Sequence, residues 1–99
     1  MQSLLLATTL LTLLTLVAGW KMTANYNDGV TSKFHGHINS GCTEFKKTDA
    51  KITSVNFNDS MFASKFVLYR DSNCQNESYK GEKGGNNVPN QVYRSYKVY

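Results

Sequence analysis

The chain has 99 residues with a formal net charge of +4, from 11 Lys and Arg against 7 Asp and Glu, and it has only two cysteines. This length is enough for one domain with a modest core and excludes a chain of several domains. The basic residues are scattered, with Lys46-Lys47 the only adjacent pair. Such scattering argues against a nucleic-acid groove, in which the charges would cluster.

Residues 1–19 have the form of a secretory signal peptide. An apolar run from Leu4 to Val17 is followed by the small residues Ala18 and Gly19. Cleavage after Gly19 and cleavage after Ala18 both fit the pattern. An uncleaved membrane anchor is the alternative, but the run is shorter than the roughly 20 apolar residues of a bilayer span. We expect a secreted, extracellular protein whose single domain covers residues 20–99.

Beyond the leader, hydrophobic residues recur with a period of two, which is typical of strands. The abundance of aromatic residues, with Leu68 the only leucine after the leader, also favours strands over helices. At most one helical turn is expected, over residues 60–65, and the Gly- and Asn-rich residues 81–90 are expected to form a loop. Several short strands separated by turns predict an all-β sandwich or barrel. The predicted strands cover residues 20–26, 33–38, 52–57, 66–69 and 92–99.

Cys42 and Cys74 are the only cysteines, and an exported chain passes through an oxidising compartment. An intramolecular disulfide between them is the leading expectation, with an intermolecular bridge or a reactive thiol as the alternative. Closing a loop of about 30 residues would stabilise the fold by about 3–4 kcal/mol on the chain-entropy model.

The chain after the leader contains two similar halves of about 40 residues each. Tyr26-Asn27-Asp28 and Tyr69-Arg70-Asp71 are similar junctions between a strand and a turn. Ser54 follows Tyr26 by 28 residues, Ser95 follows Tyr69 by 26, and each serine begins a comparable strand. Chance similarity among short β segments is the competing explanation.

Two tandem four-strand units of this kind resemble the βγ-crystallin Greek-key domain, and most nearly the short secreted proteins of filamentous fungi built on that plan. The resemblance covers residues 20–99 and is carried by Val67-Leu68-Tyr69-Arg70-Asp71-Ser72-Asn73-Cys74 and Arg94-Ser95-Tyr96-Lys97-Val98. It implies an all-β fold in which two tandem Greek keys form one sandwich.

The family's hairpin signature is an aromatic, four residues, an aromatic, one residue and then a glycine at positive φ. Tyr69, Cys74 and Asn76 occupy these positions in the second half, and Asn is the next-best residue after glycine at positive φ. Phe34 and Gly36 supply the end of the signature in the first half, where Tyr26 stands three residues too far upstream. The resemblance therefore implies positive φ at Gly36 and Asn76.

Calcium-binding members of the family carry two Asn or Asp residues, two variable positions and then Ser/Thr-Ser. The first half offers Asp49, Thr53 and Ser54 as ligands and departs from the pattern at Ala50. The second half, residues 90–95, departs at Gln91 and at Arg94, where a cation replaces a ligand. The favoured interpretation is that Ser54 and Ser95 cap turns and that no cofactor is bound, with calcium at the first position as the alternative.

Other chemistry is sparse. His35 and His37 would share one strand face and could supply two metal ligands, but no third ligand is near in sequence, so a solvated face is favoured. A hydrolase would need one of these histidines with Glu44 or Glu77, and nothing in the sequence pairs them. We expect no enzymatic activity. Asn58-Asp59-Ser60 and Asn76-Glu77-Ser78 are N-glycosylation sequons at expected turns, with Asn76 the less suitable if its φ is positive.

These features favour a monomeric, non-catalytic binding or interaction protein, effector-like or associated with a cell surface. Its expected partner is an extracellular component of a host, a competitor or a cell wall, and no nucleic acid is expected. Exposed aromatic residues and the mildly basic surface would carry the binding. The alternative is an antimicrobial or killer-type toxin that acts on membranes, which the charge of +4 permits. A small secreted ribonuclease is the third hypothesis.

Overall fold

The computed structural model describes residues 19–99, and these residues form eight strands and no helix. The leader expected over residues 1–19 therefore lies, apart from Gly19, outside the described residues. No helix in the described part of the chain is long and apolar enough to cross a membrane. The strands are β1 (Trp20–Tyr26), β2 (Thr31–Gly36), β3 (Thr43–Glu44), β4 (Ile52–Asn58), β5 (Lys65–Tyr69), β6 (Glu77–Glu82), β7 (Gly84–Gln91) and β8 (Ser95–Val98).

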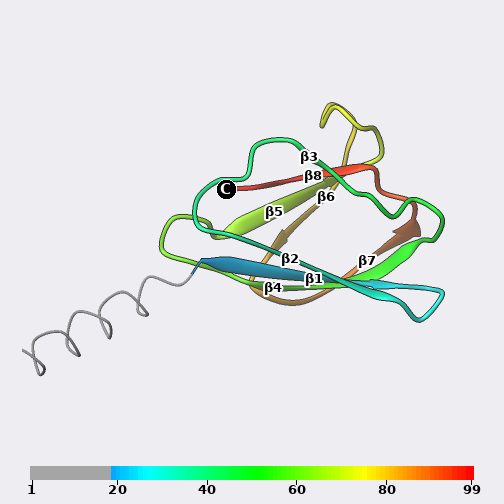
Figure 1. The fold of residues 1–99 in the computed structure, drawn as a ribbon, viewed down its shortest axis with the longest axis horizontal. Helices are drawn as coiled ribbons and strands as arrows, with labels where there is room; N and C mark the ends of the chain where they lie inside the picture. The colour runs from blue at the N-terminus through cyan, green and yellow to red at the C-terminus, as the bar shows by residue number, and fades with distance from the viewer. Residues whose placement is uncertain (1–18) are drawn as a thin grey trace, which may run out of the picture.

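The strands form two antiparallel sheets that lie one above the other (Figure 1). The first sheet has the order β2-β1-β4-β7, and the second has the order β3-β8-β5-β6. The two sheets are built on the same plan. In each sheet the first, second and fourth strands of one half of the chain lie side by side, and the third strand of the other half is added at one edge. Each half of the chain therefore places its third strand in the sheet built mainly by the other half.

The all-β fold class expected from the alternating pattern is confirmed, and so is the first strand at its predicted bounds. In β1, Trp20, Met22, Ala24 and Tyr26 are buried, while the residues between them are exposed or half-buried. Aromatic rings from both sheets meet in the core: the centroids of Phe57 and Phe66 lie 5.3 Å apart, and those of Trp20 and Tyr96 lie 6.5 Å apart. The core is therefore the layer between the two sheets.

One expectation about the chain between the strong strands is wrong. Residues 81–90 form most of β7 and the end of β6 rather than a loop. The strand β7 lies at the edge of the first sheet, where its backbone pairs with β4. Val88 is the only buried residue of β7, so hydrophobic residues do not alternate along this strand. Residues 60–65 form no helical turn, because Ser60 and Ala63 instead pair across a tight turn.

The disulfide between Cys42 and Cys74 is present, with Cα atoms 5.8 Å apart. Cys74 packs with Val67 and Tyr69 in a small cluster separate from the main core. The expected positive φ at Gly36 and Asn76 is wrong. Within residues 19–99, φ is positive at Cys74, where it is 55°, and at Gly29, Gly41 and Gly84. Gly36 is needed for another reason: a Cβ on it would lie 2.8 Å from the ring of Trp20, its cross-strand partner.

Candidate binding groove between two edge strands

The two sheets leave an open side where their outer strands β2 and β3 lie. Phe34 from β2, Phe45 just after β3 and Tyr96 from β8 pack together there. The ring centroids of Phe34 and Phe45 lie 5.4 Å apart, those of Phe34 and Tyr96 5.3 Å apart, and those of Phe45 and Tyr96 4.9 Å apart. Phe34 remains half-buried, so this aromatic cluster closes the sandwich and also reaches the surface.

A half-open groove of about 440 Å³ runs over this cluster. Its volume falls within the range of small-ligand sites, roughly 300–1,000 Å³. Buried rings supply the apolar part of the wall, and exposed charged side chains border it. The lining residues are Tyr26, Ser32, Lys33, Phe34, Thr43, Glu44, Lys46, Lys47 and Tyr96.

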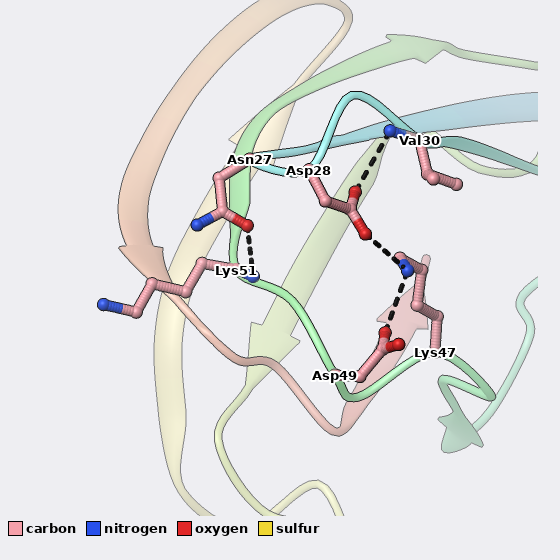
Figure 2. A network of polar contacts seen from close by, with 6 residues as sticks. All are labelled: Asn27, Asp28, Val30, Lys47, Asp49 and Lys51. Atoms are coloured by element: carbon pink, nitrogen blue, oxygen red, sulfur yellow. Dashed lines mark hydrogen bonds and ion pairs between the residues drawn. The ribbon is translucent and has the colours of Figure 1, made fainter.

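Lys47 connects two segments that border the groove, the turn after β1 and the stretch before β4 (Figure 2). Its Nζ lies 2.8 Å from Asp28 Oδ2 and 2.8 Å from Asp49 Oδ1. The hydrogen bond from Lys47 lowers the pKa of Asp28 and also that of Asp49, and the two carboxylates raise the pKa of Lys47. Lys47 is therefore neutralised within the fold.

Backbone contacts support the same connection (Figure 2). Asn27 accepts a hydrogen bond from the Lys51 amide at its Oδ1, at 3.1 Å, and its own amide donates to the Lys51 carbonyl at 2.9 Å. Asp28 Oδ1 accepts from the Val30 amide at 3.0 Å. The turn is thus fixed both within itself and against the segment that carries Lys47.

Tyr26 lies under this network. Lys47 Nζ is 5.3 Å from the centroid of its ring, within the range of a cation–π contact. The Tyr26 hydroxyl is buried and makes no hydrogen bond within residues 19–99. Burial raises the pKa of Tyr26, and the nearby Ser32 hydroxyl and Lys47 ammonium offset this only in part.

The remaining charges of the groove are solvent-exposed. Lys33 and Lys46 form no ion pair within residues 19–99, whereas Lys47 forms two. Glu44 is the only carboxylate among the lining residues. With Lys47 neutralised by Asp28 and Asp49, the groove keeps two cations against one anion beside its aromatic wall, which favours an anionic ligand.

The residues predicted as calcium ligands are engaged in other contacts within the fold. Asp49 Oδ1 contacts Lys47, whereas Thr53 Oγ1 donates to the Asn25 carbonyl at 3.2 Å and Ser54 Oγ accepts from Asn25 Nδ2 at 3.0 Å. Residues 19–99 contain no group of three or more His, Cys, Asp or Glu side chains that could hold a metal ion. Calcium binding at Asp49, Thr53 and Ser54 stays a prediction, and Asp49 Oδ1 is already held by Lys47.

Ser95 is fully buried beside the second-half turn. Its hydroxyl donates to the Asp71 carbonyl and accepts from the Cys74 amide at 3.2 Å. These contacts match the interpretation that Ser95 caps a turn. Ser54, which is half-buried, holds Asn25 of β1 in the corresponding half.

The other singled-out residues lie on the surface. His35 and His37 are both exposed, the first in β2 and the second just beyond its end. Asn58, the last residue of β4, and Asn76, just before β6, are exposed sequon positions. The φ of Asn76 is not positive, so the backbone conformation that would make Asn76 the less suitable glycosylation site is not present.

The groove itself was not predicted from the sequence. Phe34 and Tyr96 are far apart in the chain and meet only because β2 and β8 lie in facing sheets. The available signals were the adjacent pair Lys46-Lys47 and the position of Lys33 next to Phe34 in the sequence. Comparison of the chain with protein-family models, with curated proteins and with solved structures finds no match.

Proposed function

We propose that this chain is a secreted, non-catalytic binding protein on a βγ-crystallin-like scaffold of two Greek keys. The strand order supports the scaffold, because β1, β2 and β4 share one sheet while β3 crosses to the other, and β5 to β8 repeat this arrangement. The confirmed disulfide supports an extracellular location, since such bonds persist in oxidising compartments.

The groove between β2 and β3 is the recognition surface in this proposal, and its ligand is an acidic glycan of a cell surface or wall. The observation that carries the proposal is the placement of half-buried Phe34 and buried Tyr96 beside the exposed Lys33 and Lys46. Aromatic faces pack against the apolar faces of sugar rings, and ammonium groups attract the carboxylates of uronic acids.

A binding role is favoured over catalysis by the groove's composition. General acid–base chemistry needs two groups held within reach of one reacting atom. Glu44 is the only carboxylate of the lining, and neither His35 nor His37 belongs to it. The lining supplies attraction and shape rather than a matched acid and base.

The test is a calorimetric titration of the protein with oligogalacturonate, and with the methyl-esterified oligomer as the uncharged counterpart. Binding is expected for the acidic oligomer only. The double variant Lys33→Glu/Lys46→Glu should weaken binding about tenfold or more, equivalent to about 1.4 kcal/mol or more.

The matched control is Lys80→Glu/Lys83→Glu, which changes the net charge equally. Lys80 lies in β6, the outer strand at the opposite edge of the second sheet, and Lys83 follows it directly. An equal loss in both double variants would reduce the effect to general charge and contradict a groove site. No binding of the acidic oligomer by the wild type would also overturn the proposal.

A further inference from the structure

The loop between β4 and β5 presents two large apolar side chains to solvent. Met61 is 90 % exposed and Phe62 is 61 % exposed. They are the two central residues of a tight turn in which the Ser60 amide donates to the Ala63 carbonyl at 2.8 Å and the Ala63 amide donates back at 3.4 Å. Such positions are usually taken by Gly, Asn, Asp or Ser. The turn is anchored by buried Ala63, so its tip is held outward.

Two more exposed apolar side chains lie at the same end of the molecule. Ile38 is 66 % exposed, and Tyr99 is 43 % exposed. The Tyr99 carbonyl accepts hydrogen bonds from the Ser64 and Lys65 amides at 3.0 and 2.8 Å, directly after the turn. We call Ile38, Met61, Phe62 and Tyr99 the apolar end.

Ile38 lies in the connection between β2 and β3, and contacts with β1 hold this connection at the same end of the molecule. The Ile38 carbonyl accepts from Trp20 Nε1 at 2.9 Å, and the next residue of β1, Lys21, pairs with Asn58 at the end of β4. Figure 1 shows the β4–β5 loop, the carboxyl end, the β2–β3 connection and the start of β1 together on its left side.

The exposed charged side chains around the apolar end are three lysines and two carboxylates. Lys21, at the start of β1, Lys65, at the start of β5, and Lys83, between β6 and β7, lie there together with Asp59 of the loop and Glu82, the cross-strand partner of Lys65. An apolar tip flanked by cations is suited to the interface of an anionic bilayer, where rings and thioethers enter the headgroup region and lysines meet phosphates.

We propose that the apolar end docks the protein on anionic membrane surfaces. This surface is separate from the groove, whose lining includes none of the four residues of the apolar end. A second copy of the chain is a weaker occupant, because a standard interface takes roughly 20–30 residues a side and this tip offers four apolar side chains. The bilayer requires no complementary protein surface.

The test uses the protein purified from the medium of an expressing eukaryotic host, with its amino terminus determined by mass spectrometry. It is sedimented with vesicles of phosphatidylcholine, with and without phosphatidylglycerol. We expect association with the anionic vesicles only. Met61→Ser/Phe62→Ser should weaken it about tenfold or more, because burial of each side chain is lost.

Val30→Ser is the matched control. Val30 is also an exposed apolar residue, but it lies in the β1–β2 turn at the opposite end of the molecule. This variant should sediment like the wild type. Phe62→Trp supplies a second measurement, because the natural Trp20 is buried and a blue shift of emission on vesicles would report entry of the introduced indole.

Several outcomes would overturn the proposal. These are no association of the wild type, an equal loss in the Val30→Ser control, or unshifted emission of Phe62→Trp on vesicles. A concentration-dependent dimer that Met61→Ser/Phe62→Ser abolishes, without vesicle association, would assign the apolar end to a second copy instead. Glycan titration of the same variant keeps the two proposals distinguishable, since groove binding should be unchanged.

Discussion

The two halves of the chain follow the same strand plan but hold their first hairpin turns by different chemistry. In the first half, Lys47 reaches from a distant segment to Asp28 in the turn. In the second half, Asp71 satisfies the turn locally, because its carboxylate accepts hydrogen bonds from the backbone amides of Asn76 at 2.8 Å, Gln75 at 3.1 Å and Asn73 at 3.3 Å. One backbone plan is thus compatible with a long-range ion pair and with a local anion site made of backbone amides.

Both halves also pack a glycine against an aromatic ring, and a Cβ on the glycine would lie closer to the ring in the second half. Each pairs an aromatic residue with a glycine across its first hairpin, Trp20 with Gly36 and Phe66 with Gly81. A Cβ on Gly36 would lie 2.8 Å from the Trp20 ring, and one on Gly81 would lie 2.2 Å from the Phe66 ring. The second half therefore has less space for a side chain at its glycine position.

The largest effect is expected from removing the disulfide, which covers the second half's turn. Cys42→Ser/Cys74→Ser should lower the free energy of unfolding by about 3–4 kcal/mol, because the loop of 32 residues is no longer closed. Urea denaturation measures this change. Amide exchange should quicken more in β3 and β8 than in β1 and β2, and equal quickening in both sheets would contradict the asymmetry.

An intermediate effect is expected from filling the two glycine positions. Gly81→Ala should destabilise the fold by about 1–3 kcal/mol through overpacking against buried Phe66, and Gly36→Ala should destabilise it less. Urea midpoints of the two variants measure the difference. A larger loss for Gly36→Ala would show that the Trp20 contact, and not the Phe66 contact, is the tighter one.

The smallest effect is expected from the exposed carboxylates and appears as a pH dependence. The pKa values of Asp28, Asp49 and Asp71 are lowered from 3.8. The hydrogen bond from Lys47 is the largest cause for Asp28 and Asp49, and the hydrogen bond from the Asn76 amide is the largest cause for Asp71. Their stabilisation is full above the unfolded pKa, near pH 4, and is lost as the pH falls through the folded values.

Thermal melts from neutral pH down to about pH 2 measure how much each half contributes to the loss of stability at acid pH. Lys47→Met should make the loss of stability at acid pH shallower by removing the first half's share, and its effect at neutral pH should shrink in high salt. Asp71→Asn should remove the second half's share with less dependence on salt. An unchanged acid slope in Lys47→Met would show that the ion pairs contribute nothing to folding.

Strands with one buried face were predictable, and features made by the meeting of distant strands were not. Residues 20–26 alternate because one side of β1 faces the core, so its bounds were predicted correctly. The strand β7 carries Gly, Asn and Pro at an edge where backbone pairing suffices, so its side chains gave no signal. The Cys42–Cys74 bond followed from the presence of only two cysteines.

The candidate site was less predictable than the fold. The groove depends on β2 and β3 lying at the same open side of two facing sheets, which no local pattern encodes. Lys47 was visible only as half of a basic pair, and its neutralisation by Asp28 and Asp49 required the tertiary structure. Predicted ligands such as Thr53 and Ser54 were placed by spacing alone, and the fold uses them to hold Asn25.

The exchange of third strands between the sheets has a consequence for folding. A chain cut between β4 and β5 would leave one fragment with β3 lacking its partner β8, and another with β7 lacking its partner β4. Neither fragment could complete a four-stranded layer alone. Native pairing therefore depends on segments far apart along the chain. For such a topology of high contact order we expect slow folding as a single cooperative unit.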